Sequence, residues 1–547
     1  MSTARSPAAD LILTNGRVFC GLHEGFAEAV AVAGERILAV GDAATIEGYR
    51  GPATKTIDLA GRLAVPGLNE AHLHVVHVGL GMIEMNLRPE RGIRSLDDIY
   101  SQVADAVGTR QPGEWITGRG YDHNELVEGR HPSIEDLDRL APHNPVYIER
   151  TCGHLAVANS RALEVAGIST ATPDPEGGLI ERVDGRLTGL LAERAMRLIV
   201  NVKPKPDVKR IVEAIERAGK FLLSQGFTSA MDAAVGFLAG MDELTAYDEA
   251  AASGRLPLRT WITIYGNPDE GIGEAAHAAG YRQGTERGRM RIGAMKIFAD
   301  GSAGALTAAM SEPYLVGDPA NRGILTYSQE VMHDYLARYH RQGYQLAIHA
   351  IGDVAIERVL SGIEAADTTD QPILGRRHRI EHCGFLTGGQ MARMVAAQVD
   401  PVPQPVFIYE FGDLYVANVG QARADRSYPL KSWIEAGLHP AASSDAPVCA
   451  TDPFKNIYTM ITRKTRRGTV IGADQCVSVA QALHAYTALG AYTQFAENEK
   501  GRIVPGLLAD IAVFSRDIFT ATPEEIETET QCDLTILGGA VVFDRHA

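Results

Sequence analysis

Both ends of the chain alternate apolar and polar positions with the period of two that is typical of half-buried β-strands. Between residues 10 and 64 the alternation runs through DLILTNGRVF, EAVAVAGERILAVG and TKTIDLAGRLAV, and the NG and AGER breaks indicate hairpin turns. The end of the chain returns to this pattern in ADIAVFSRD and DLTILGGAVVFD. We therefore predict that both termini, residues 1–65 and 500–547, build one small β-sandwich domain.

The middle of the chain, residues 66–499, alternates short apolar runs with segments of helical periodicity. Apolar residues at i, i+3, i+4 and i+7 predict helices in VKRIVEAIERAGKFLLSQ and SQEVMHDYLARYHRQ. The eight candidate strands are RLAVPGLNEAHLH, GFTSAMDA, LRTWITIYG, GAMKIFADG, YQLAIHAIGD, HRIEHCG, AAQVDPVPQ and HPAASSDAP. This alternation predicts an α/β protein with a (β/α)8 TIM barrel. An open doubly wound sheet is the alternative, but the chain lacks the Gly-rich phosphate-binding turn of that fold.

The stretch between the first and second candidate strands, about residues 84–205, is longer than one helical crossover. It contains strand-like pieces of its own, EWITGRGYD and NPVYIERTCGH, and the Gly-rich turn TPDPEGGLI. Barrel active sites lie at the carboxyl ends of the strands, where long loops supply lids and substrate contacts. We therefore predict an inserted, lid-like region over the barrel mouth.

Composition and charge narrow the function classes. Of the 547 residues, 45% are hydrophobic and 22% are charged, which is the balance of a soluble globular protein. The net charge of −16 argues against a nucleic-acid partner, because such binding needs a basic surface. We find no secretory signal, no apolar run long enough for a membrane span and no CxxC pair, so we expect a cytoplasmic protein with reduced thiols. Because two-fold dimers are the commonest oligomers, we expect a homodimer that acts on a small molecule.

Metal-competent side chains lie at or near the ends of five candidate strands. His72 and His74 end the first strand, and strand alternation places both side chains on one face. Lys296 lies in the apolar run GAMKIFADG, where a charged side chain is costly without a partner. The remaining candidates end the strands in YQLAIHA, HRIEHC and AASSDAP: His349, His382 and Asp445. Because the carboxyl ends of barrel strands meet at one mouth, we expect these six side chains to converge.

Each of these residues also has a structural interpretation. A single histidine at a strand end more often makes a structural hydrogen bond than a metal bond, and an HxH pair alone is a weak signal. Lys296 could reach out to solvent, and Asp445 could cap a turn in SSDAP. The order and strand placement of all six residues together favour a metal centre.

The order of these residues resembles that of the amidohydrolase superfamily of metal-dependent hydrolases. The motifs that carry the resemblance extend over nearly the whole chain: VPGLNEAHLH, EWITGRGYD, RTCGHLAVANSRAL, TPDPEGGLI, MKIFADGSAGALTAAM, IHAIGD, RIEHC, SSDAPV and GRIVPGLLADIAVF. They are most similar to amidohydrolase family 3, whose members include N-substituted formamide deformylases. The resemblance implies a metal-dependent hydrolase that cleaves a carbon–nitrogen bond.

The resemblance also implies how the metal is held. His72 and His74 would bind one divalent transition metal ion, and His349 and His382 would bind a second. Imidazole suits several such metals, so the ligand type leaves the metal open, with zinc as our first expectation. Lys296 resembles the lysine that many members carboxylate with CO2, and its carbamate would bridge two cations. If Lys296 stays unmodified, a single-metal site is the better expectation.

The implied reaction is hydrolysis without a protein nucleophile. Asp445 would bind metal, accept a proton from the metal-activated water and return it to the leaving nitrogen. The preferred substrate is a linear amide, an N-acyl or N-formyl amine. One alternative is a deaminase that acts on a cyclic amidine or nucleobase-like substrate with a single metal. Another is a catalytically silent binding protein on the same scaffold.

One departure from the superfamily and several weaker candidates complete the prediction. Glu70 precedes the first histidine by two residues, where the superfamily usually has Asp, and we place it behind the metal ligands. His154 matches a histidine of the family and is a candidate for substrate contact. Tyr121, Asp300 and Gln404 could line the pocket, or each could be a structural hydrogen-bond partner.

Overall fold

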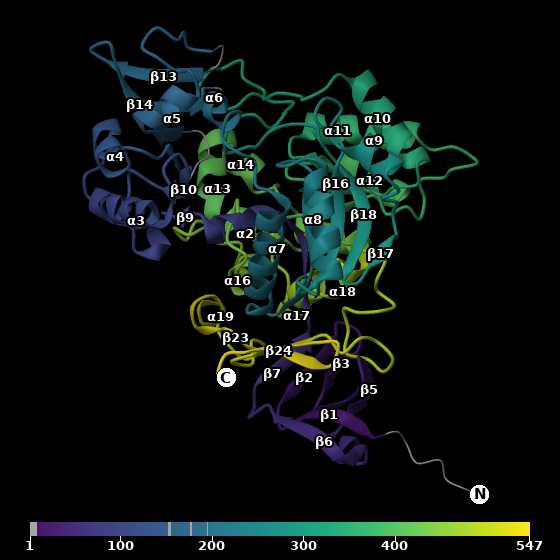
Figure 1. Ribbon diagram of the computed structural model, residues 1–547. Coiled ribbons are helices and arrows are strands. Elements are labelled where there is room, and N and C mark those ends of the chain that lie inside the picture. Colours follow the sequence, from purple (N-terminus) through teal and green to yellow (C-terminus); the bar gives the residue numbers. More distant parts are fainter. Residues whose placement is uncertain (1–7, 151–154, 176–177, 194) are drawn as a thin grey trace, which may run out of the picture. The chain divides into compact units, whose positions relative to one another are not determined.

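The computed structural model describes residues 8–150, 155–175, 178–193 and 195–547 (Figure 1). The chain divides into two compact units, residues 1–76 with 215–547 and residues 77–214. The first unit contains a β-domain and a barrel, and the second contains a mixed sheet with its helices. Within the described residues, no helix combines the length and apolarity of a membrane span, and the cysteines are free thiols.

Two sheets that share an apolar core form the β-domain. The four-stranded sheet has the order β5 (Arg36–Gly41), β4 (Ala29–Ala33), β1 (Ala9–Thr14) and β6 (Arg50–Asp58). The six-stranded sheet has the order β24 (Ala540–Asp544), β23 (Cys532–Leu537), β22 (Ile511–Phe514), β7 (Leu63–Pro66), β2 (Arg17–Gly21) and β3 (Gly25–Ala27). Strand β22 pairs antiparallel with β7, so amino-terminal and carboxyl-terminal strands lie side by side. Leu13, Val30 and Ile511 belong to the core that both sheets cover. Two short helices accompany the sheets, α1 (Ala43–Glu47) and α19 (Pro523–Glu529).

Seven parallel strands form the barrel sheet. Their order is β8 (Leu68–Leu73), β15 (Phe227–Val235), β16 (Arg259–Tyr265), β18 (Met290–Phe298), β19 (Leu346–Ala350), β20 (Arg379–His382) and β21 (Asp400–Val402). A short strand, β17 (Glu286–Arg287), pairs antiparallel with β18. All residues of β8, β15, β19, β20 and β21 are buried, which explains their continuous apolar runs in the sequence.

The eighth predicted strand, residues 439–447, is extended chain that lies between β8 and β21 without a continuous ladder. Asp445 N–H donates to the carbonyl of His72 at 2.9 Å, and His74 N–H donates to the carbonyl of Ala446 at 2.8 Å. On the other side, His439 N–H donates to a carboxylate oxygen of Asp400 at 2.9 Å. Pro440 and Pro447, near the two ends of HPAASSDAP, have no backbone N–H and so limit the ladder that this segment can form. The (β/α)8 barrel is therefore nearly closed, and the fold prediction is confirmed.

Helices follow most barrel strands. They are α7 (Val208–Leu223), α8 (Met241–Ala252), α9 (Gly273–Ala278), α10 (Gln329–Arg341), α11 (Asp353–Ala365), α12 (Gly388–Ala397), α13 (Val406–Val419), α14 (Gln421–Ala424), α15 (Leu430–Glu435), α16 (Pro453–Thr462), α17 (Val479–Tyr486) and α18 (Ala488–Thr493). The two helices predicted from periodicity are α7 and α10, and both are confirmed. Helix α10 begins where the Ser328 side chain accepts the backbone N–H of Val331.

Buried polar side chains lie where several barrel strands begin. His378 accepts the N–H of Leu346 at Nδ1 (3.0 Å), and its Nε2 lies 2.9 Å from Nδ1 of His340. Since Nδ1 of His378 is an acceptor, its proton is on Nε2 and is donated to His340. Lys500 is buried as well, and its ammonium donates to Ser229 and, at 2.7 Å, to Gln494.

The second unit contains a six-stranded sheet. Its order is β13 (Gly178–Val183), β14 (Arg186–Glu193), β12 (Leu155–Ala158), β11 (Val146–Arg150), β10 (Ile116–Tyr121) and β9 (Met85–Asn86). Its helices are α3 (Leu96–Thr109), α4 (Ile134–Leu140), α5 (Ser160–Val165) and α6 (Met196–Val200), and α2 (Val75–Ile83) leads into it. The strand-like pieces EWITGRGYD and NPVYIERTCGH correspond to β10 and β11, which are parallel neighbours. That this region covers the barrel mouth stays a prediction, as do the predicted domain boundaries.

Candidate metal centre

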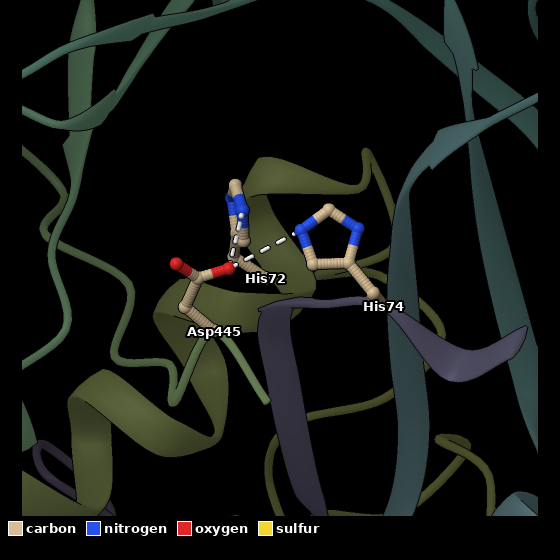
Figure 2. Close-up of side chains that lie close together, drawn as sticks. All are labelled: His72, His74 and Asp445. Carbon is tan, nitrogen blue, oxygen red and sulfur yellow. Dashed lines mark ion pairs between the residues drawn. The ribbon is translucent and has the colours of Figure 1, made fainter. Parts of the chain in front are cut away.

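Three predicted ligands lie together where β8 meets the extended segment 439–447. His72 and His74 come from the end of β8 and the residue after it, and Asp445 points toward both (Figure 2). Oδ1 of Asp445 lies 3.3 Å from Nε2 of His72 and 3.3 Å from Nε2 of His74. One potential ligand atom from each residue lies within 4.8 Å of the other two. Two imidazoles and one carboxylate at this spacing suit a divalent transition metal ion.

The other two predicted histidines extend this cluster along the strand ends. His349 lies in β19 and His382 ends β20, and these strands are parallel neighbours. The ring centroids of His349 and His382 are 4.5 Å apart, and those of His382 and His72 are 5.1 Å apart. The structure therefore brings all four histidines and Asp445 to one place, while their binding of metal stays a prediction.

Lys296 lies in β18 beside this cluster and is fully buried. Its ammonium nitrogen has no hydrogen-bond partner in the described part of the chain. Burial lowers the pKa of Lys296 to about 8, although the carboxylates of Glu381 and Asp445 act in the opposite direction. A buried lysine with a lowered pKa has a larger neutral fraction, which is the form that reacts with CO2.

Two residues that the sequence analysis missed, Arg379 and Glu381, hold His72. The Glu381 carboxylate accepts a short hydrogen bond from Nδ1 of His72. Arg379 donates to both oxygens of Glu381, from Nε at 2.5 Å and from Nη2 at 3.0 Å, and Nη2 also donates to the carbonyl of Ala71 at 2.7 Å. Burial would raise the pKa of Glu381, but the charges of Arg379 and His72 lower it below its ordinary value. Glu381 is therefore ionised and keeps the proton of His72 on Nδ1.

The sequence feature that could have identified these two residues is the motif RIEH. Arg379 and Glu381 are two positions apart, so a strand places both side chains on the same face. Both are fully buried in the structure. A buried strand tolerates two charged side chains only when they pair, so the motif could have indicated an internal ion pair.

In His382 and His349, as in His72, one ring nitrogen lies against a partner outside the cluster. That nitrogen is Nδ1 in His72 and His382 and Nε2 in His349. Nδ1 of His382 lies 2.5 Å from Oε1 of Gln404, whose amide nitrogen donates to Ser443 and to the carbonyl of Val402. Nε2 of His349 lies 3.1 Å from the carbonyl of Gly301. Within the described residues, Nδ1 of His349 lacks a hydrogen-bond partner, and Nε2 of His72 lies 3.3 Å from Oδ1 of Asp445. A ring nitrogen held by an outer partner, with the second nitrogen of the ring left to bind a cation, is typical of metal ligands, so the donor set fits a metal centre.

The backbone is left-handed at two of the six candidates. φ is +69° at His382 and +57° at Asp445, in the region that residues other than glycine rarely adopt. Such residues cost about 1–3 kcal/mol each and concentrate at functional sites. This strain supports a functional role for the two positions.

Glu70, in β8, forms hydrogen bonds with the backbone of β8 and of the segment that carries Asp445. It is fully buried, and its Oε1 accepts the N–H of Ser444 at 2.8 Å and that of His72 at 3.3 Å. Burial raises the pKa of Glu70 to about 8. Its contacts are with the backbone of these segments, which agrees with a place behind the ligands.

The four predicted substrate contacts lie in different surroundings. Gln404 is buried and contacts His382, as described above. Asp300 is also buried, and its carboxylate accepts three backbone N–H groups from the loops after β18 and β19. Tyr121 lies in the second unit with its hydroxyl 2.8 Å from Nδ1 of His131, and His154 falls outside the described residues. Their roles in substrate binding stay predictions.

A sequence model described as Amidohydrolase family matches residues 55–543 of the chain. The chain belongs to the amidohydrolase family. The N-substituted formamide deformylase of Arthrobacter pascens is 29% identical over 551 residues, which cover 98% of this chain and 98% of that enzyme. Protein LONG AFTER FAR-RED 3 of Arabidopsis thaliana is 31% identical over 547 residues, which cover 98% of this chain and 92% of that protein.

The fold of this amidohydrolase-family chain is also found in a solved structure. An uncharacterized metal-dependent hydrolase from Pyrococcus furiosus is 28% identical, with a TM-score of 0.77, and the match covers 93% of this chain and 100% of that one. The family and the barrel predicted from sequence are both confirmed. The chain is thus a metal-dependent hydrolase, and the alternative of a silent binding protein loses its support.

Proposed function

We propose that the chain hydrolyses the C–N bond of a linear amide, an N-acyl or N-formyl amine. The proposed metal ligands are the six residues predicted from sequence: His72, His74, Lys296, His349, His382 and Asp445. The likeness to a relative named as an N-substituted formamide deformylase supports this substrate class. Zinc as the metal, the homodimer and the cytoplasmic location remain predictions from sequence.

The observation that carries this proposal is the buried amine of Lys296 beside the histidine cluster. Its nitrogen has no hydrogen-bond partner among the described residues, and burial lowers its pKa. In carboxylation, the amine lone pair forms a bond to the carbon of CO2 and the amine loses one proton. The product is a carbamate whose single negative charge is shared by two oxygens, so it could bridge two cations. A single-metal deaminase has no comparable need for this lysine.

Different side chains of the cluster have different roles in the proposed reaction. When bound, a divalent transition metal supplies Lewis acidity and makes a bound water more acidic. Oδ1 of Asp445, which lies between His72 and His74, is suited to bind the metal, so the other carboxylate oxygen is available to accept a proton and return it to the leaving nitrogen. Glu381 and Gln404 keep the outer nitrogens of His72 and His382 hydrogen-bonded, so that their other nitrogens face the cluster.

The test is the metal content per chain, measured by elemental analysis for the wild type, Lys296→Ala and the exposed control Lys55→Ala. We expect about two ions in the wild type and the control, and one or fewer in Lys296→Ala. Hydrolysis of N-formyl and N-acetyl amines, followed by release of the amine, should fall with metal content. A single ion that Lys296→Ala leaves in place would favour the deaminase, and no metal after reconstitution would contradict the proposal.

A further inference from the structure

An aromatic ring lies directly against the proposed metal cluster. Phe298 follows Lys296 by two residues on β18, so both side chains lie on the same face of the strand. The centroid of the Phe298 ring is 4.8 Å from Nζ of Lys296 and 5.2 Å from the ring centroid of His349. The backbone N–H of Phe298 donates to Oδ1 of the buried Asn267 at 2.9 Å, which fixes the start of this loop. Phe298 is therefore held where a substrate at the cluster would meet it.

Two further rings, one buried and one half-exposed, lie next to Phe298. The ring centroid of Tyr265, at the end of β16, is 6.1 Å from that of Phe298. The Phe237 ring, just beyond β15, lies 5.2 Å from Tyr265 and 6.4 Å from Phe298. We call these three residues the aromatic wall. Since they follow three neighbouring strands and their rings contact one another in pairs, the aromatic wall is one continuous group of rings that begins at the cluster and ends at the exposed Phe237.

The backbone at the end of β15 is shaped to present Phe237. φ is +67° at Ala234 and +104° at Gly236, both in the left-handed region. A Cβ atom at residue 236 would overlap the side chain of Ile272, so only glycine fits this turn. Phe237 is 52% exposed, whereas Tyr265 is 2% exposed. A half-exposed phenylalanine on a strained turn beside a reactive cluster points to a ligand-binding role more than to a role in the core.

We propose that the aromatic wall binds a flat apolar substituent of the substrate, an aryl or arylalkyl group attached on one side of the scissile C–N bond. Phe298 and Phe237 are then specificity-determining residues. This proposal rests on the amide hydrolysis proposed above. Aromatic rings favour edge-to-face or offset stacking at centroid separations of about 4.5–7 Å, and such pairs add to the effect of burying apolar area. About half of the Phe237 side chain is exposed, and a substrate ring can cover that part.

The test compares three amides of similar size. N-pentylhexanamide has no ring, N-pentyl-3-phenylpropanamide has a ring on the acyl side, and N-(2-phenylethyl)hexanamide has a ring on the amine side. We expect one of the phenyl amides to have the highest kcat/KM with the wild type, which also shows the side that the aromatic wall binds. Phe237→Ala and Phe298→Leu should lower the ratio of that value to the value for N-pentylhexanamide about 3- to 10-fold.

A matched control is Phe26→Ala, because Phe26 is 44% exposed in the β-domain and should leave all three values unchanged. The proposed role of the aromatic wall is wrong if the wild type shows no preference for a phenyl amide, or if both Phe237→Ala and Phe298→Leu keep that preference. In either case the proposed function stands. If none of these amides is hydrolysed, and the N-formyl and N-acetyl amines tested above are not hydrolysed either, the proposed function fails. The aromatic wall is then tested by saturation-transfer NMR of the metal-loaded protein with 4-phenylbutan-2-one. Saturation transfer from the wild type to the phenyl protons of the ketone, reduced in Phe237→Ala, would support the aromatic wall. No transfer from the wild type, or equal transfer from Phe237→Ala, would overturn it.

Discussion

Replacement of Glu381 by glutamine separates the orientation of a metal ligand from ordinary packing. The amide has nearly the same shape as the carboxylate but carries no charge and has only one acceptor oxygen. Glu381 now accepts from Nδ1 of His72 and from two nitrogens of Arg379. In Glu381→Gln at least one of these donors must face an NH2 group, and Arg379 keeps a buried charge without its counter-ion.

Both consequences have magnitudes that can be estimated from the buried geometry. Removing one partner of a buried ion pair costs about 3–5 kcal/mol, because the other charge stays desolvated. Arg379 and Glu381 are both fully buried, so we expect the upper half of that range to apply. Loss of an outer partner of a metal-bound histidine lowers metal affinity about 10- to 100-fold. Glu381→Gln should therefore be less stable without metal and should also bind metal more weakly.

The assay measures the two effects apart. Competition with a chelator, followed by elemental analysis, gives the metal affinity, and denaturant unfolding of the metal-free protein gives the stability. The double variant Arg379→Met/Glu381→Leu removes both charges, so it should regain most of the stability and keep the weak metal binding. If Glu381→Gln binds metal within about 2-fold of the wild type, Glu381 does not orient a metal ligand. If the double variant is as unstable as Glu381→Gln, the loss is not due to an unpaired charge.

Three further predictions use other buried groups. Gln404→Leu removes the acceptor for Nδ1 of His382 and should lower metal affinity about 10-fold by the chelator assay, whereas Gln404→Glu should keep it. Burial is the main cause that holds the pKa of His378 well below 6.5, and the neighbouring His340 is the second. Below pH 6.5 the unfolded chain therefore binds more protons at this residue than the folded chain does. The free energy of unfolding should therefore decrease as pH falls from about 6.5, and less steeply in His378→Gln. Burial lowers the pKa of Lys500 to about 7 from 10.5, so stability should rise with pH between these values, and Lys500→Met should flatten that rise in denaturant unfolding.

Periodicity was sufficient to predict the barrel, but it could not predict which contacts complete the site. Strand-end histidines such as His349 and His382 could be placed from sequence because parallel strands share one carboxyl edge. Gln404 was a candidate for substrate contact, and in the structure it contacts His382 from a buried position. The contact is made by Nδ1 of His382 with a residue 22 positions further along the chain. It depends on the orientation of the His382 ring, which sequence patterns do not show. The eighth strand was predicted from its small, apolar residues, and the structure has extended chain there without a continuous ladder, in keeping with the missing backbone N–H groups of Pro440 and Pro447.

The pairing of β7 with β22 has a consequence for the order in which the chain can fold during synthesis. Strand β7 leads directly into β8, which carries the first candidate ligands, yet its antiparallel partner is residues 511–514. The last candidate ligand, Asp445, also follows His72 by more than two-thirds of the chain. A growing chain must therefore expose residues 511–514 before β7 finds its antiparallel partner, and Asp445 before the cluster can close. Until then β7 presents an unpaired edge, so we expect the nascent chain to depend on chaperone protection more than a chain with local contacts would.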